Sequence, residues 1–257
     1  MREKLEAFER LLNMMDELRE KCPWDKKQTI ESLRHLTIEE TYELSDAILK
    51  KDVNELKKEL GDILLHIVFY ARIASETKDF NIADVMNSLC DKLIFRHPHI
   101  YSDVKVSGEE EVKQNWEKLK QKEKNGNVTV LSGVPNSMPA LLKAYRIQEK
   151  ARAVGFDWEN PEEVYGKVKE ELNELDHEVA QEHNTERIED EFGDVLFSLI
   201  NYARFLKVNP EDALEKTNKK FIKRFTYMEQ KIKEKGKAIG DCTLAEMDVY
   251  WNEAKKL

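Results

Sequence analysis

The 257-residue sequence contains few residues that interrupt helices, with 9 glycines and 6 prolines. These numbers are too small for a turn-rich β-sandwich or barrel, and far too small for a flexible linker protein. Hydrophobic residues make up 40% of the chain and charged residues 36%, so the composition does not predict disorder. Few helix breakers together with abundant Leu, Glu and Lys predict a mostly helical protein with a heavily charged surface.

Cysteine is scarce as well. Cys22, Cys90 and Cys242 lie far apart and form no CxxC pair. This argues against a disulfide framework or a zinc site and favours free thiols in a reducing compartment. The N-terminal segment is charged from its second residue and has no apolar signal core, and no stretch approaches the roughly 18 apolar residues of a membrane span. We therefore expect a cytoplasmic protein with no membrane partner.

An excess of basic residues is also absent, because the formal net charge is −9. Proteins that bind DNA or RNA usually present a basic face. We therefore expect no nucleic-acid partner. A local cationic pocket for a small anion remains compatible with this charge.

An acidic pattern occurs twice in the chain. Residues 38–70 and 169–202 each contain EExxE and, after a gap, ExxD in a run that holds Gly-Asp and apolar residues. The first acids of the two copies are 131 residues apart and the second acids 132, so the second copy has one extra residue between them. The corresponding acids are Glu40 with Glu171, Glu43 with Glu174, Glu59 with Glu191, and Asp62 with Asp194.

The internal similarity extends to basic and aromatic residues. The corresponding residues are Lys92 with Lys220, Arg96 with Arg224, Trp116 with Trp251, and Lys120 with Lys255. An ordered series of such matches predicts an all-α protein with two tandem homologous helical-bundle domains. Because glycines and prolines gather between the copies, we expect domains over 1–125 and 139–257, joined by a linker over 126–138.

Apolar spacing and capping residues predict ten helices. Their ranges are 3–20, 29–50, 52–76, 82–96 and 109–124 in the first half, and 138–153, 161–182, 185–206, 210–235 and 243–256 in the second. Thr37, three residues before Glu40, is expected to take part in a capping arrangement. Pro161 and Pro210 suit the first turns of their helices.

The paired acids of each copy share one helix face, because they are three residues apart. Two neighbouring helices would then direct four carboxylates at one point, which is costly unless a cation neutralises them. An all-oxygen site of this kind suits Mg²⁺ or, as a substitute, Mn²⁺. The alternative is that each acid pair lies on an ordinary solvated helix face.

The residues after Asp62 and Asp194 favour the metal interpretation. These runs are apolar nearly all round, so we expect both helices to be mostly buried, and an Asp that opens a buried run is seldom left unpaired. Gly61 and Gly193 each cost about 1 kcal/mol inside a helix. Their place beside the acids predicts that another backbone or a ligand comes close there.

Two other metal interpretations fit the spacing less well. Ferritin-like diiron proteins use Glu-x-x-His, whereas Glu59 and Glu191 are each followed at that spacing by Asp. His97 and His99 form a potential ligand pair, but such a motif is more often a packed, hydrogen-bonded loop, and the second half has no counterpart.

Several longer segments are distinctive. They include CPWDKKQTIESLRHLTIEETYELSDAI, KELGDILLHIVFYARIA, RHPHIY, MPALLKAYRIQEKARAVGFDW, EFGDVLFSLINYARF, NKKFIKRF and EMDVYWNEAK. In these segments the chain resembles the two-domain MazG nucleoside triphosphate pyrophosphohydrolases, from about Leu11 to its C-terminus. The acidic pattern alone is shared by the wider all-α NTP pyrophosphatase superfamily, whereas the full set of segments is specific to MazG.

This resemblance implies an all-α helical-bundle fold, a homodimer, and Mg²⁺-dependent cleavage of nucleoside triphosphates to NMP and pyrophosphate. It also implies broad use of ribo- and deoxyribonucleotides and a role in clearing unwanted nucleotides or tuning alarmone levels. In the family, the C-terminal domain carries the activity and the N-terminal domain need not hydrolyse nucleotides.

The cations beside the acids differ between the two halves. Lys167 and Arg187 lie four residues before Glu171 and Glu191, whereas the first half has Leu36 and Glu55 at those places. A triphosphate carries about four negative charges and needs such donors, so the active site is expected in the second half. The alternative is that both cations form ordinary surface pairs.

We assign roles to the second-half residues on this basis. Glu171, Glu174, Glu191 and Asp194 would hold Mg²⁺, and Glu170, Glu171 and Glu174 form the catalytic set, with Glu170 or Glu174 as proton acceptor. The first-half acids Glu40, Glu43, Glu59 and Asp62 form a second, inactive set. Lys167, Arg187, Lys220, Arg224 and Trp251 would bind the nucleotide, with Trp251 stacking on the base.

Three alternatives remain at this point. Trp251 could instead be a core aromatic that anchors the last helix. The enzyme could be a narrow hydrolase for dUTP or an alarmone. The first domain could be a regulatory scaffold that binds a nucleotide or a partner without cleavage.

Overall fold

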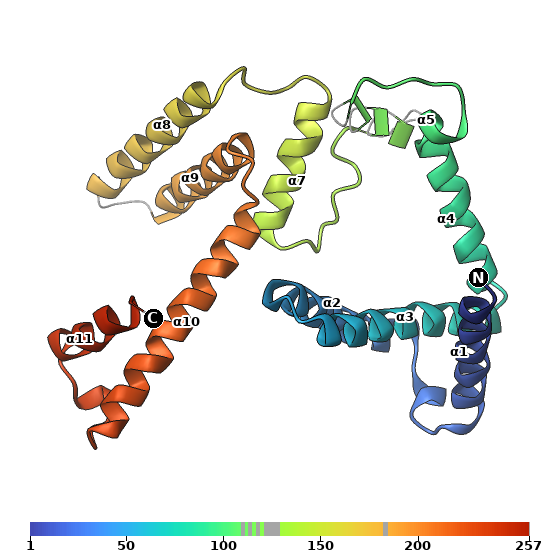
Figure 1. Ribbon diagram of the computed structural model, residues 1–257. Helices are drawn as coiled ribbons and strands as arrows, with labels where there is room; N and C mark the ends of the chain where they lie inside the picture. Colours follow the sequence, from blue (N-terminus) through green and yellow to red (C-terminus); the bar gives the residue numbers. More distant parts are fainter. Residues whose placement is uncertain (109–110, 113–114, 117–118, 121–128, 182–184, 257) are drawn as a thin grey trace. The chain divides into compact units, whose positions relative to one another are not determined.

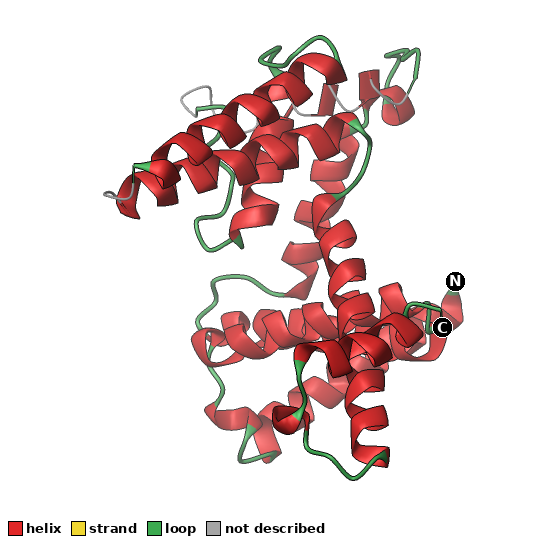
Figure 2. Ribbon diagram, turned by 90° about the vertical axis from the view of Figure 1, so that its left-hand side faces the viewer, coloured by secondary structure: helices red, strands yellow, loops and turns green. Residues whose placement is uncertain are grey.

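The computed structural model describes residues 1–256, except 109–110, 113–114, 117–118, 121–128 and 182–184. Within these described residues every regular element is a helix and no strand occurs (Figure 2). The predicted all-α class is confirmed. The chain divides into two compact units, Met1–Ser107 and Gly108–Leu257. The expected domain boundaries at 125 and 139 stay predictions, because part of the intervening segment lies outside the described residues.

The first unit is built on a helical hairpin. Its elements are α1 (Arg2–Lys21), the short 3₁₀ helix η1 (Asp25–Lys27), α2 (Ile30–Lys50), α3 (Val53–Glu76), α4 (Ile82–Arg96) and α5 (Pro98–Tyr101) (Figure 1). Lys51 adopts a left-handed conformation with φ 56°, and the Asp52 side chain accepts hydrogen bonds from the backbone N–H groups of Asn54 and Glu55. This two-residue turn ends α2 and starts α3, so the two helices pack side by side.

A small apolar core joins α1 to the hairpin. Met15, Leu33, Val68 and Phe69 are each no more than 3% exposed and form one cluster. At the end of α1, the Arg19 guanidinium donates to the Glu76 carboxylate of α3 at 2.8 Å. The core and this ion pair hold α1 against α3, which leaves the opposite part of the hairpin open for polar groups.

Thr37 does not have the capping role that we expected. Helix α2 starts seven residues earlier, where Thr29 and Ser32 form a capping box. The Thr37 hydroxyl instead lies 2.8 Å from His66 Nδ1 and 2.7 Å from the Tyr70 hydroxyl. Because these partners belong to α3, Thr37 cross-links the two helices of the hairpin.

The second unit repeats the hairpin. It contains α7 (Ala140–Ala153), α8 (Pro161–Ala180), α9 (Thr185–Phe205), α10 (Pro210–Glu234), the 3₁₀ helix η2 (Ile239–Asp241) and α11 (Leu244–Ala254). Helix α8 packs along α9, and α7 packs on α9 through a 2.8 Å hydrogen bond from Gln148 Nε2 to the Phe197 carbonyl. Helix α11 packs on α10, where the Phe221 and Trp251 rings lie 5.0 Å apart.

Nine of the ten predicted helices are confirmed, with ends that differ by two residues at most. Pro161 and Pro210 lie at the first helical positions, after the capping residues Asn160 and Asn209. The tenth helix, predicted over 109–124, falls largely outside the described residues. No described helix is long and apolar enough to cross a membrane.

Helices α3 and α9 are less buried than their apolar sequences predict, and each exposes a stripe of large apolar side chains. The stripes consist of Leu60, Leu64 and Ile67 on α3 and Phe192, Leu196 and Leu199 on α9, all at least 39% exposed. No chain atom lies within 4 Å of a Cβ built at Gly61 or Gly193. The expected close approach of another backbone from this chain is therefore wrong for both glycines.

The first-unit core generates a stability prediction. Replacing Met15 with Ala removes a fully buried side chain and should lower the free energy of unfolding by about 2–5 kcal/mol. The neighbouring Met14 is 49% exposed, so Met14→Ala should change stability by less than about 0.5 kcal/mol. Urea unfolding followed by circular dichroism measures both values, and equal effects of the two changes would show that α1 is not docked through Met15.

Candidate metal centres

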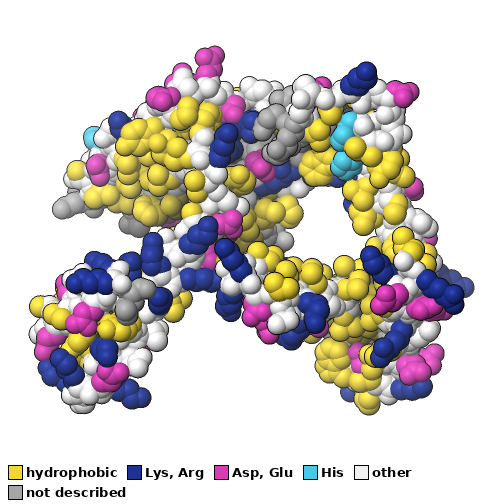
Figure 3. Space-filling view, viewed as in Figure 1, with side chains coloured by type: hydrophobic (Ala, Val, Ile, Leu, Met, Phe, Trp, Pro, Cys, Tyr) yellow, Lys and Arg dark blue, Asp and Glu magenta, His cyan; other side chains and the backbone are white. Residues whose placement is uncertain are grey.

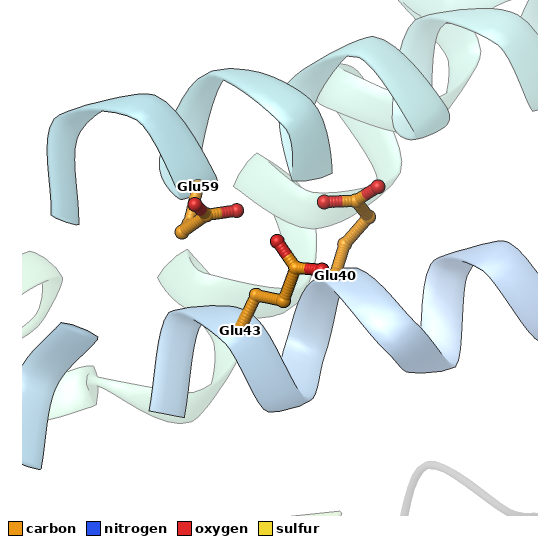
Figure 4. A group of neighbouring side chains, drawn as sticks. All are labelled: Glu40, Glu43 and Glu59. Carbon is orange, nitrogen blue, oxygen red and sulfur yellow. The ribbon is translucent and has the colours of Figure 1, made fainter. Parts of the chain in front are cut away.

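The first-half hairpin brings three carboxylates together. Glu40 and Glu43 project from one face of α2 toward α3, and Glu59 projects back from α3 (Figure 4). One carboxylate oxygen from each of the three lies within 4.8 Å of the others. The i,i+3 spacing on α2 and the short turn into α3 are sufficient to produce this arrangement.

Glu59 is the member of this group that most clearly fits a cation. Its side chain is 3% exposed, and its Oε1 accepts a 2.9 Å hydrogen bond from Lys58 Nζ. Its Oε2 is buried and has no hydrogen-bond partner. Because an unpaired buried carboxylate oxygen is costly, a divalent cation with oxygen ligands fits this position.

The electrostatics of the first centre agree with this fit. Burial raises the pKa of Glu40, and the negative charges of Asp62, Glu43 and Glu59 raise it further. The pKa of Lys58 is also raised, because its ammonium group hydrogen-bonds to Glu59. Both shifts report an excess of negative charge that Lys58 neutralises only in part.

The second-half hairpin contains the corresponding group. Carboxylate oxygens of Glu171 and Glu174 on α8 and of Glu191 on α9 lie within 4.8 Å of one another. A pocket of about 490 Å³ opens beside them. Its lining residues are Glu170, Asn173, Glu174, His177, Glu178 and Glu191.

Lys167 is bound to the carboxylates of this second centre. Its Nζ lies 2.9 Å from Glu170 Oε1 and 2.8 Å from Glu171 Oε1, and these hydrogen bonds raise the lysine pKa. The pKa of Glu174 is raised by desolvation and by the charge of Glu171. The centre thus combines a fixed cation with a carboxylate that binds a proton more readily than usual.

The other predicted residues lie farther from the carboxylate groups. Asp194 is exposed on α9 and is not in the three-carboxylate group, and in the first half Asp62 is likewise outside it. Arg187 Nη1 lies 3.7 Å from Glu178 Oε1.

Lys220, Arg224 and Trp251 lie on α10 and α11, and none of them lines the pocket. The Arg224 guanidinium lies 6.0 Å from the centre of the Trp251 ring, which also contacts Phe221. These contacts support the alternative in which Trp251 anchors the last helix.

The sequence interpretation missed four residues near the two centres. Lys58 supplies a cation to the first centre, and Asn173, His177 and Glu178 line the second pocket. The available signal was spacing, because Asn173 and His177 lie three and seven residues after Glu170 on the same helix. His97 and His99 belong to neither carboxylate group; His97 Nδ1 hydrogen-bonds the Leu93 carbonyl at 2.7 Å.

Comparison with known proteins agrees with this repeated arrangement. A family model described as the MazG nucleotide pyrophosphohydrolase domain matches residues 28–101 and 159–228, which contain both carboxylate groups. The chain therefore belongs to the MazG nucleotide pyrophosphohydrolase family and carries two regions that match its domain.

Three relatives illustrate the similarity. A nucleoside triphosphate pyrophosphohydrolase/pyrophosphatase MazG from Thermotoga maritima is 46% identical, over 99% of this chain and 98% of the relative. A nucleoside triphosphate pyrophosphohydrolase from Escherichia coli K12 is 38% identical, over 98% of each chain. An uncharacterized Bacillus subtilis protein, YabN, is 45% identical over 91% of this chain and 48% of its own length.

The unpaired Glu59 oxygen generates a metal-binding prediction. Glu59→Gln keeps the side-chain shape but removes the charge, so Mn²⁺ affinity at the first centre should fall at least about tenfold. Glu55→Gln on the same helix should leave that affinity unchanged, since Glu55 is exposed and lies outside the carboxylate group. Calorimetric titration of the full chain with Mn²⁺ measures both. Equal binding by Glu59→Gln and the unchanged protein would exclude Glu59 as a ligand.

Proposed function

We propose that this protein hydrolyses nucleoside triphosphates to NMP and pyrophosphate with Mg²⁺, or Mn²⁺ as a substitute, in its second half. The observation that carries the proposal is the convergence of Glu171, Glu174 and Glu191 beside an open pocket, with Lys167 bound to the same carboxylates. Membership of the MazG family and the printed activities of the relatives support it. We also propose a cytoplasmic location without a nucleic-acid partner, as the sequence predicts.

The carboxylates have the chemistry that a Mg²⁺ site requires. The converging oxygens of Glu171, Glu174 and Glu191 are hard donors, and we keep Asp194 as a candidate fourth ligand that needs a local side-chain movement. When bound, divalent cations neutralise phosphate oxygens and act as Lewis acids toward the reacting phosphorus.

The chain's own residues perform the remaining steps. Glu174 takes a proton from the attacking water, because its raised pKa makes it a better base than an ordinary Glu. Glu170 is the alternative acceptor, but its carboxylate is held by Lys167 at 2.9 Å. The water oxygen bonds to the α-phosphorus, the bond to the bridging oxygen breaks, and pyrophosphate leaves with the electron pair. Lys167 donates to the phosphate oxygens on which charge increases.

Arg187, Lys220, Arg224 and Trp251 remain proposed nucleotide contacts. Stacking on an aromatic face tolerates any base, which supports broad use of ribo- and deoxyribonucleotides in nucleotide-pool cleaning or alarmone control. A narrow dUTP or alarmone hydrolase would use the same acids, and a substrate panel distinguishes the two.

The first half is proposed to bind a cation without hydrolysing nucleotides. Leu36 occupies the position of Lys167 and packs against the apolar core, so no lysine can lie there beside the phosphates. Lys58 provides a cation from α3 instead. The first domain thus has a regulatory or dimerisation role.

We also propose a homodimer. The stripes on α3 and α9 occupy matching positions of the repeat, since Leu60, Leu64 and Ile67 each lie 132 residues before Phe192, Leu196 and Leu199. Figure 3 shows hydrophobic side chains gathered over α8 and α9. An exposed apolar surface repeated in both halves is typical of a face that a second chain covers.

The reaction products test the proposed activity. Incubation with several nucleoside triphosphates and Mg²⁺ should release NMP and pyrophosphate, and Glu174→Ala should lower turnover at least about a hundredfold. Glu43→Ala, the matching change in the first half, should keep most of the activity. Release of NDP and orthophosphate would contradict the assigned bond, and the opposite mutant result would move the active site to the first half.

Oligomeric mass tests the dimer. The unchanged protein should elute at twice the chain mass, and Leu196→Glu should convert it to monomer by placing a charge in the buried contact. Val154→Glu, at another exposed apolar residue, should leave the dimer intact. Light scattering after size-exclusion chromatography measures the masses; a monomeric unchanged protein would contradict the proposal.

A further inference from the structure

Polar side chains form a continuous stripe along α8 that extends beyond the metal centre. Its members follow one another at spacings of three and four residues, so they share one helix face. In order along α8 they are Lys167, Glu170, Glu171, Glu174, His177 and Glu178, with Asn173 beside Glu174. At a rise of 1.5 Å per residue, the stripe from Lys167 to His177 is about 15 Å long.

The chemical order of this stripe matches the order of groups in the proposed substrate. A cation comes first, then the carboxylates, then an amide and an imidazole. Because the bond that breaks joins the α- and β-phosphorus, the α-phosphate must lie at the carboxylates. If the pyrophosphate group lies toward Lys167, the nucleoside must extend toward Asn173 and His177.

The pocket extends on the same side. Asn173, His177 and Glu178 line it together with the centre residues Glu174 and Glu191, whereas Lys167 does not. Glu178 is paired with Arg187 at 3.7 Å. This leaves the Asn173 amide and the His177 ring as the uncharged polar groups of the pocket.

His177 is held in place within the helix, because its Nε2 lies 2.5 Å from the side-chain nitrogen of Gln181. Asn173 has no hydrogen-bond partner within the described part of the chain, so its amide can both donate to and accept from a ligand. One residue is therefore oriented in advance and the other is available for new bonds.

The first half lacks both groups. At the shift of 131 residues, Asn173 corresponds to Tyr42 and His177 to Asp46. Tyr42 is 62% exposed, and Asp46 lies 3.6 Å from Lys50. The two hairpins share their carboxylates and differ at the place where a nucleoside would lie.

We propose that Asn173 and His177 bind the nucleoside part of the substrate, with the Asn173 amide hydrogen-bonding the sugar and the His177 ring packing against the base. This inference rests on the proposed function, because that function places the α-phosphate at the carboxylates. Aromatic and imidazole rings stack on any base, so His177 contributes affinity with little base selection.

Binding by two matched ligands tests the proposal. Calorimetry of the full chain with Mg²⁺ compares a nonhydrolysable nucleoside triphosphate analogue with inorganic tripolyphosphate, which has no nucleoside. Asn173→Ala and His177→Ala should each raise the Kd of the nucleotide roughly threefold to tenfold, the worth of one such contact. Both variants should bind tripolyphosphate as the unchanged protein does.

Two further variants complete the test. His177→Phe keeps an aromatic face and should retain nucleotide affinity, whereas a tenfold loss there would overturn the packing role of the ring. Asp176→Ala changes the neighbouring residue of α8, which does not line the pocket, and should bind both ligands normally.

Two results would overturn the proposal as a whole. One is an unchanged nucleotide Kd in both alanine variants, and the other is an equal loss for tripolyphosphate, which would place these side chains at the phosphates or the cation. Neither depends on turnover, so a protein that releases no NMP but loses nucleotide affinity selectively would refute the proposed hydrolysis and support the nucleoside site.

Discussion

Repulsion between carboxylates that face each other across a two-helix hairpin is the constraint on which this structure depends. In each half, three such groups converge with oxygens within 4.8 Å, and like charges so close destabilise the fold unless they are compensated. Lys58 and Lys167 compensate only in part, because Glu59 retains a buried oxygen without a partner and the pKa of Glu174 is still raised. The remaining charge explains why a divalent cation, and through it a polyphosphate, fits between these helices.

Much of the fold and the carboxylate groups could be predicted because they depend on local rules. Helix ends follow from capping residues such as Asn160 and Asn209 and from prolines in first turns. The acids converge because i,i+3 spacing places them on one face. The turn at Lys51 and Asp52 then brings α3 back along α2, so the approach of Glu59 to Glu40 follows from the sequence alone.

The features that sequence missed depend on tertiary neighbours. Thr37 resembled a capping residue, but its hydroxyl found partners on α3 that no spacing along α2 reveals. The apolar run after Gly193 predicted burial, yet a single chain covers only one face of α9. Burial depends on which surface packs against the helix, and a neighbouring chain leaves no signal that distinguishes it from a neighbouring helix.

The two halves show how one hairpin can support different roles. The carboxylates occupy the same helical positions in both, because the spacing and the short turn determine where they meet. Residues at the ends of the stripe are free of that constraint: Leu36 joins the apolar core where Lys167 contacts acids, and Asp46 pairs with Lys50 where His177 lines a pocket. A duplicated site can therefore keep its affinity for cations while the groups beside it change, and these groups decide whether a nucleotide can be held and cleaved there.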